Sequence, residues 1–407
     1  MRLVMAEERV GLVLAGGGAR GAYEVGALSV LLPALEARGE RPTVLVGTSV
    51  GAINIAYLAA NADLSADDAV AGGVELWRSL RWDQVLGPLL APSTAVRALC
   101  YAADVLGVGG AMLTGVLDTR PLARTVRRAI DFERLHRHID AGLLDAIAVV
   151  ATSAATTRSV VFVEGQPVPA ADAGQGIDYV AARIDGEHVR ASAAIPTLFP
   201  AVHVSSPVRA RGWYVDGGVR LNAPLRPALS LEVDRVVVIG LNAVPSAPPR
   251  LASEHRPDAF QSAADFLNGT LVNQLVEDVR DLARVNLLLG DRGKVIAADG
   301  WRYRRVPFIF ITPRARADVG GMAGRIFEEH YEGLEALRSI DLDLALLARL
   351  IGGDGAGHGE LSSYLFFAPE FATALIELGR SDAQRWLTAH TGPEGPWEVQ
   401  GTVLAGD

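Results

Sequence analysis

The chain has 407 residues, of which 50% are hydrophobic and 21% charged, and its formal net charge is −9. A chain of this length and composition can bury a large core in one big domain or two modest ones. The negative charge argues against nucleic acid as a partner, because phosphate contacts need a positive surface. Cys100 is the single cysteine, which excludes an intramolecular disulfide and a cysteine-based zinc site.

We find no convincing targeting signal or membrane span. The first ten residues carry four charged side chains and lack the apolar core of a signal peptide. The uncharged stretch Pro42–Ala62 is long enough to span a bilayer, but it holds a strand, a glycine-rich turn and Asn54. We therefore expect a cytoplasmic protein without a signal peptide or transmembrane helix, with peripheral membrane contact left open.

The chain begins with an alternation of short apolar strands and helices. Val10–Ala15 is an apolar run that ends at glycine, as a buried parallel strand does. From Gly21 to Arg38 the apolar residues recur at spacings of three and four, which predicts a helix. Thr43–Val46 is predicted as the second strand and Ala52–Ala60 as the second helix. Because crossovers between parallel strands are right-handed in nearly all cases, both strand ends point to one edge of the sheet.

Each of these two strands ends at a turn rich in small residues. The first turn contains Gly16, Gly17 and Gly18, and the second contains Ser49 within Gly47-Thr48-Ser49-Val50-Gly51. The glycines supply flexible backbone N–H groups, and the second turn presents a hydroxyl on a sharp bend. Since both turns share one sheet edge, they suit a serine nucleophile beside an oxyanion hole.

Other interpretations of these turns have to be weighed. Residues Gly16–Gly21 also match the Gly-x-Gly-x-x-Gly fingerprint of dinucleotide-binding folds. That fingerprint expects an acidic residue at the end of the second strand, where this chain continues into Gly47-Thr48-Ser49, so a dinucleotide site is disfavoured. A triad hydrolase would need an acid and then a histidine downstream, but no later histidine stands in a distinctive motif. A tight turn with a solvated serine remains open at this point.

Farther on, a nearly uncharged segment is followed by an arginine-rich one. Val85–Leu117 carries only two charged residues, which predicts buried helices in an insertion. The alternative is an apolar cap or acyl-chain channel beside the site. Beyond it, Arg120, Arg124, Arg127 and Arg128 fall on one helical face with acidic residues interleaved. This pattern favours a solvated, ion-paired face over an anionic-lipid site.

Strands and helices continue to alternate towards the C-terminus. Trp213–Val215 leads into Asp216-Gly217-Gly218, which leaves a carboxylate at a flexible strand end, although a plain turn accounts for any single Asp-Gly-Gly. Ala259–Leu289 is predicted as a long amphipathic helix. Further strands are predicted at Ala146–Ala151, Val160–Val163, Val236–Gly240 and Val306–Ile311. The alternation indicates an α/β fold with helices on both faces of the sheet.

Four short motifs occur in order along the chain. They are the glycine-rich Gly16–Gly21, the elbow Gly47–Gly51, the segment Ala191–Pro196, and Asp216-Gly217-Gly218, which follows that segment by 20 positions. Together they resemble the patatin-like phospholipases, a family of lipid acyl hydrolases that use a serine–aspartate dyad and no histidine. Each motif alone is weak, and the resemblance rests on all four.

The resemblance implies a fold and a division of the chain. The fold would be a three-layer α/β/α arrangement with a mostly parallel central sheet, a helical insertion and a C-terminal extension. Residues 8–225 would form the catalytic domain. Residues 226–407, which resemble bacterial members through less specific motifs, would pack on it and complete the same α/β domain.

The resemblance also implies a role for each motif residue. Ser49 would attack the ester carbonyl, and Asp216 would accept its proton and pass it to the departing alcohol. Backbone N–H groups would stabilise the oxyanion, in a loop that contains Gly16, Gly17, Gly18 and Arg20. The two turns would be supported by Gly47, Gly51, Gly217 and Gly218.

The implied function is hydrolysis of carboxylic esters in phospholipids or glycerolipids through an acyl-serine intermediate. The partner would be a lipid, and no metal or cofactor is expected. A transacylase would use the same residues and differ in the acceptor of the acyl group. The alternatives are a lipid-binding protein with a vestigial site and, more remotely, a dinucleotide-binding protein. Head group, acyl length and oligomeric state are not predicted.

Overall fold

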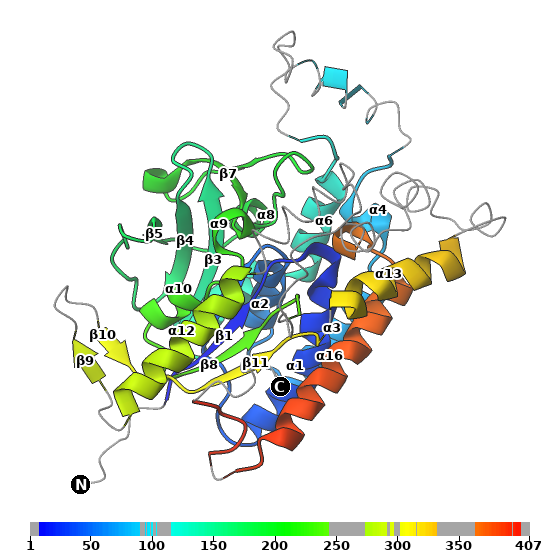
Figure 1. Cartoon of the computed structure of the whole chain (residues 1–407). Helices are drawn as coiled ribbons and strands as arrows, with labels where there is room; N and C mark the ends of the chain where they lie inside the picture. The colour runs from blue at the N-terminus through cyan, green and yellow to red at the C-terminus, as the bar shows by residue number, and fades with distance from the viewer. Residues whose placement is uncertain are drawn as a thin grey trace, which may run out of the picture.

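The computed structural model describes a sheet flanked by helices (Figure 1). It describes residues 8–89, 115–243, 273–290, 294–296, 302–314, 316–331, 363–392 and 394–399, with six single positions between 94 and 103. Most of the predicted insertion and the first half of the predicted helix Ala259–Leu289 lie outside the described residues. None of the helices in the described segments combines the length and apolar character that crossing a bilayer requires.

Nine strands of the described part form one sheet, and five of them are parallel neighbours in the order β11-β8-β1-β2-β3. Their residues are almost all buried, as expected for strands covered by helices on both faces. Two of the five, β8 and β11, come from the chain beyond residue 226. The bounds are Val10–Leu14 (β1), Val44–Thr48 (β2), Ala146–Ser153 (β3), Arg235–Ile239 (β8) and Phe308–Ile311 (β11).

The remaining four strands extend the sheet past β3. β4 (Ser159–Gly165) is antiparallel to β3, and β5 (Ile177–Ala181) is parallel to β4. β7 (Gly212–Asp216) runs antiparallel to the last residues of β3 and pairs with β6 (Val202–Val204). Thr48 lies opposite Val150, and the next residue, Ala151, lies opposite Asp216. This register places Asp216 at the sheet edge where β2 ends.

Helices cover both faces of the sheet (Figure 1). One face carries the crossover helices α1 (Gly21–Glu36) and α2 (Val50–Ala60), with α3 (Ala66–Ser79), α7 (Phe132–Asp140) and α16 (Pro369–Ala389) packed against them. The other face carries α10 (Leu225–Ser230) and α12 (Asn273–Leu289). The predicted three-layer α/β/α fold with a mostly parallel central sheet is thus confirmed.

The remaining elements complete the described chain. The helices are η1 (Gly18–Arg20), α4 (Trp82–Val85), α6 (Arg120–Ala129), α8 (Gly186–Ser192), η2 (Val208–Ala210), α9 (Gly218–Leu221) and α13 (Arg316–Tyr331). A small hairpin is formed by β9 (Lys294–Ile296) and β10 (Arg302–Arg304).

The arginine face of α6 differs from the predicted ion-paired surface. Arg120 pairs with Asp118, whose carboxylate lies 2.6 Å away. Arg124, Arg127 and Arg128 are exposed and make no ion pair with any residue that the structure describes. The prediction was wrong for these three, because the interleaved acidic residues flank α6 rather than lie on it. One of them, Asp131, caps α7 instead.

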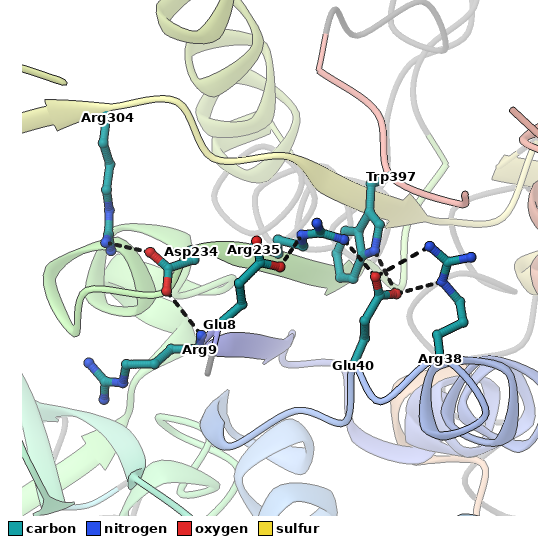
Figure 2. A network of polar contacts seen from close by, with 8 residues as sticks. All are labelled: Glu8, Arg9, Arg38, Glu40, Asp234, Arg235, Arg304 and Trp397. Atoms are coloured by element: carbon teal, nitrogen blue, oxygen red, sulfur yellow. Dashed lines mark hydrogen bonds and ion pairs between the residues drawn. The ribbon is translucent and has the colours of Figure 1, made fainter. Parts of the chain in front are cut away.

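A polar network ties the C-terminal part to the edge of the sheet where the parallel strands begin (Figure 2). Arg235, the first residue of β8, bonds to Glu40 at 2.7 Å and to Glu8 at 2.8 Å. Glu40 also accepts hydrogen bonds from Arg38 at 2.7 Å and from the Trp397 indole N–H at 2.9 Å. Burial alone would raise the pKa of Glu40, but these hydrogen bonds and the two guanidinium charges hold it below its ordinary value.

Candidate active site

Ser49 occupies the bend between β2 and α2. Its backbone has φ 55° and ψ −123°, a conformation that side chains other than glycine rarely adopt. The bend is tight because Gly47 and Gly51 allow backbones to approach closely. A β-carbon on Gly47 would strike the Gly51 carbonyl, and one on Gly51 would strike that of Leu14. The structure therefore presents Ser49 on a nucleophile elbow of the kind that its sequence pattern predicts.

Asp216 faces Ser49 from the end of β7. The Ser49 hydroxyl donates to Asp216 Oδ2 at 2.6 Å, and the two residues are only 5% and 6% exposed. The other carboxylate oxygen accepts from the Gly218 N–H at 2.7 Å, in the turn formed by Gly217 and Gly218. No histidine of the described residues bonds to either side chain. The serine hydroxyl thus has a carboxylate as its direct partner.

The segment Ala191–Pro196 holds the serine and aspartate turns together. The Ser49 N–H donates to the Ser192 hydroxyl at 2.8 Å, and the Asp216 N–H donates to the Ala194 carbonyl at 2.8 Å. The Gly217 N–H donates to the Ser192 carbonyl at 3.2 Å. The segment therefore has a structural role, since its hydrogen bonds fix the two turns relative to each other.

The environment of Asp216 makes its carboxylate a stronger base than usual. Burial raises the pKa of Asp216 to about 7, although the hydrogen bonds from Ser49 and Gly218 offset part of this rise. No cation contributes to the balance. At neutral pH the carboxyl group is therefore divided between its acid and base forms, a state suited to moving a proton.

The glycine loop between β1 and α1 lies against the serine. A β-carbon on Gly16 would approach Ser49 Cβ to 3.0 Å. Gly18 has φ +59°, and a side chain there would also collide with the Tyr364 carbonyl. The N–H groups of Gly17 and Gly18 have no acceptor among the described residues. The loop thus offers two free N–H donors beside Ser49, as an oxyanion hole requires.

An apolar cavity extends from Ser49 into the layer of helices. Its lining includes Ser49 and Gly18 at one end and consists mainly of aliphatic and aromatic side chains of α1, α2, α3 and α6. Tyr364 and Phe367 also contribute to its wall. Of the predicted cap Val85–Leu117, the described residue that lines the cavity is Val85. The apolar space beside Ser49 is therefore lined by a different set of elements from the predicted cap.

Comparison with known protein families shows to which family the chain belongs. The sequence model of the patatin-like phospholipases matches residues 12–229, more than half of the chain. The chain belongs to this family. A search of curated protein sequences gave no match. Membership of the patatin-like phospholipases supports a lipid-hydrolysing activity for the chain.

Solved structures give distant likenesses to this patatin-like protein. VipD from Legionella pneumophila is 14% identical with a TM-score of 0.33, over 76% of this chain and 62% of VipD. Human GIVD cytosolic phospholipase A2 is 13% identical with a TM-score of 0.41, over 98% of this chain and 60% of the enzyme. The chain thus spans about three fifths of the length of both. At these values the likenesses carry no argument about substrate.

Arg20 anchors the glycine loop of this patatin-like domain to the C-terminal part. Its buried guanidinium donates to the Ser363 hydroxyl at 2.8 Å and to the Asn242 side chain. It also lies 4.0 Å from the centre of the Tyr364 ring, within the range of a cation–π contact. Sequence reasoning linked Arg20 to the loop but missed Asn242, Ser363 and Tyr364 as its partners. The contacts join residues 343 positions apart, and no local pattern reveals them.

A second missed cluster lies at the wall of the cavity. The Asn54 amide donates to Glu24 Oε2 at 2.7 Å and to the Gly21 carbonyl at 3.1 Å. Its oxygen accepts from the Trp77 indole N–H at 3.0 Å. Burial raises the pKa of Glu24 well above its ordinary value, and the bond from Asn54 offsets only part of this. Asn54 is thus held with its polar atoms hydrogen-bonded to protein partners at the wall of the cavity.

Proposed function

We propose that this patatin-like protein is a serine–aspartate lipid acyl hydrolase that cleaves carboxylic esters of phospholipids or glycerolipids. The observation that carries the proposal is the 2.6 Å hydrogen bond from the Ser49 hydroxyl to the buried Asp216 carboxylate. Its position at the end of an apolar cavity favours an ester with an acyl chain. The lipid is then the partner, met in solution or at a membrane surface.

The reaction would proceed in two steps. Ser49 Oγ attacks the ester carbonyl as Asp216 takes the hydroxyl proton, and the negative oxygen accepts bonds from the N–H groups of Gly17 and Gly18. Asp216 then protonates the departing alcohol, which leaves an acyl ester on Ser49. Water attacks this ester, Asp216 accepts its proton and returns it to Ser49 Oγ, and the carboxylic acid departs. Asp216 acts as base and then as acid in each half.

The test uses a fluorophosphonate probe and soluble esters. We expect wild-type protein to be labelled on Ser49, and Ser49→Ala to lose both labelling and ester hydrolysis. Ser381→Ala, which changes an exposed serine of α16, is the matched control and should behave as the wild type. Hydrolysis retained by purified, folded Ser49→Ala would sink the assignment. Product analysis with added alcohols then separates hydrolysis from acyl transfer.

A further inference from the structure

The cavity is built from one face of each of its helices. The lining residues of α2 follow a helical spacing from the serine downwards, and those of α3 and α6 do the same. For α2 they are Val50, Ile53, Asn54, Tyr57 and Leu58. Nine residues separate Ser49 from Leu58, which corresponds to about 13 Å along the helix axis. The cavity therefore follows α2 for most of its length.

The pairing of α2 with α3 shows which residues lie deep in the cavity. Trp77 bonds to Asn54, and a β-carbon on Gly73 would meet Tyr57 and Val25 at 3.4 Å. The two helices are therefore antiparallel, so the start of α3 lies beside the far end of α2. Gly73 lines the cavity level with Tyr57, eight residues beyond the serine, and its missing side chain leaves the Tyr57 and Val25 side chains as the nearest neighbours on this side. A larger side chain at this position would fill the deep part of the cavity.

The Asn54 amide, which lines this path, is satisfied by protein partners, whereas the buried Glu24 Oε1 and the Tyr364 hydroxyl have no hydrogen-bond partner among the described residues. Asn54 is bonded to Glu24, Gly21 and Trp77, and burial raises the pKa of Glu24. An apolar chain in the cavity would thus leave the hydrogen bonds of Asn54 in place. The wall suits methylene groups despite the asparagine and glutamate nearby.

Building on the proposed hydrolase, we propose that this cavity holds the acyl chain of the substrate along α2, and that Gly73 sets its depth. The chain starts at the carbonyl attacked by Ser49 and points towards Leu58. The lining of α2 extends for about 13 Å, the length of about ten carbons of an extended chain with carbon–carbon bonds of about 1.5 Å in a zigzag. The cavity of about 80 Å³ has to widen to admit a chain of that length. Shorter chains leave apolar wall uncovered, and longer chains must bend.

The test compares nitrophenyl esters from acetate to palmitate. We expect wild-type kcat/KM to rise by about fourfold per methylene to about ten carbons and then level off. Gly73→Leu should lower the decanoate-to-acetate ratio at least tenfold, and Leu58→Ala should move the plateau to longer chains. Ala71→Leu, on the exposed face of α3, should keep the wild-type ratio. Gly73→Ala should lower the decanoate-to-acetate ratio less than Gly73→Leu, because its β-carbon would contact Tyr57 and Val25 at 3.4 Å without a clash.

Failure of this inference can be told from failure of the hydrolase. Turnover of every ester without dependence on chain length, or a Gly73→Leu profile equal to that of Ala71→Leu, overturns the acyl channel alone. Loss of all turnover in the wild type contradicts the hydrolase instead. In that case calorimetry of decanoate with Ser49→Ala, with and without Gly73→Leu, still decides the channel. Equal affinity for both proteins rejects it.

A second, independent observation concerns the outer face of α6. Arg124 and Arg128 line a surface groove that shares Leu76, Leu80, Thr125 and Ala129 with the acyl cavity. Asp83 also lines the groove, at 4.0 Å from Arg81. The two arginines and Arg127 have no ion pair among the described residues. The groove thus lies next to the acyl cavity, with these four side chains shared between the two.

A fourth cation lies close to this surface. Burial lowers the pKa of Arg190, and the positive charge of Arg127 lowers it further, while the charges of Glu187 and Asp185 oppose this shift. Arg190 makes no ion pair with the described residues either. Gathered cations repel one another, which costs stability unless an anion is bound. In a chain of net charge −9 this local excess is complementary to an anionic surface.

We infer that this arginine surface, Arg124, Arg127 and Arg128 of α6, docks on a membrane rich in anionic phospholipid. Guanidinium groups bind phosphate with paired donors. The apolar face of the same helix lines the cavity, so docking would place the mouth of the groove against the lipid.

The test measures vesicle binding with the inactive Ser49→Ala background, so hydrolysis does not interfere. We expect co-sedimentation with phosphatidylglycerol vesicles and little with phosphatidylcholine vesicles. Arg124→Gln with Arg128→Gln should weaken partition by about 25-fold, at about fivefold per arginine. Arg280→Gln with Arg284→Gln on α12 removes the same charge and should change nothing. Equal binding to both lipids, or equal loss in both double variants, overturns the inference.

Discussion

Two carboxylates at opposite ends of β2 show how environment sets the role of a residue type. Asp216, beside the end of the strand, is buried with a hydroxyl and a backbone N–H as partners, and burial raises its pKa to about 7. Glu40, before the start of the strand, is also withdrawn from water but bonds to Arg38, Arg235 and Trp397. Despite the opposing effect of burial, these partners lower its pKa. Asp216, which has no cation beside it, can act as a base. Glu40, which has two arginines beside it, instead links neighbouring segments of the structure.

The largest expected difference is in activity. Asp216→Asn should lower kcat/KM for a soluble ester by about a thousandfold, the range of a lost general base. Glu40→Gln should leave it within about twofold, since Glu40 lies at the other edge of the sheet. Initial rates with purified proteins, together with circular dichroism, measure both. Similar losses of activity in the two variants would contradict a catalytic role for Asp216 and a purely structural role for Glu40.

Asp216→Asn, which should lower activity, should raise the stability of the folded protein above neutral pH. The folded protein binds the Asp216 proton more tightly than the unfolded chain does, so its stability falls as pH rises from about 4 to about 7. Asp216→Asn avoids this loss and should be more stable than the wild type at pH 8, on the order of 3 kcal/mol. Denaturant unfolding at pH 5 and pH 8 measures the difference. A variant less stable than the wild type at pH 8 would show that burial of the charge is not the dominant cost.

A smaller effect is expected at Glu40. Its pKa is lowered in the folded protein, so its contribution is present above the unfolded value and is lost as pH falls through the folded one. Glu40→Gln should reduce the free energy of unfolding by about 1.5 kcal/mol at pH 7. The reduction should shrink in acid, the reverse of the trend at Asp216. A pH-independent loss would point to packing rather than charge.

The parts of the fold that sequence could predict are those set by local pattern. The strands β1 and β2 and their helices follow from apolar runs, helical spacing and the glycine-rich turns. Asp216 could be singled out because an acidic residue and two glycines end a strand. The resemblance to a family then joined positions 167 apart, which no periodicity links.

The remainder depends on contacts between distant segments. Arg20 meets Ser363 and Tyr364 only because the C-terminal part folds back over the glycine loop. In the sequence, Glu24 and Asn54 look like ordinary helix residues, and only the structure shows that both are buried and bonded to each other. α16 and β5 were not predicted from sequence. The unpaired state of Arg124 became visible only when its acidic neighbours were seen to lie off the face of α6.

The pH dependence of kcat/KM on a soluble ester tests most directly whether Asp216 is the base. A protonated Asp216 cannot accept the serine proton, so the rate should rise through pH about 7, where the pKa of this buried carboxyl lies. Glu40→Gln should show the same rise of kcat/KM with pH, because Glu40 takes no part in the reaction. A profile that is flat from pH 5 to pH 9, or one that rises near pH 4 as for an exposed carboxylate, would contradict the role given to Asp216.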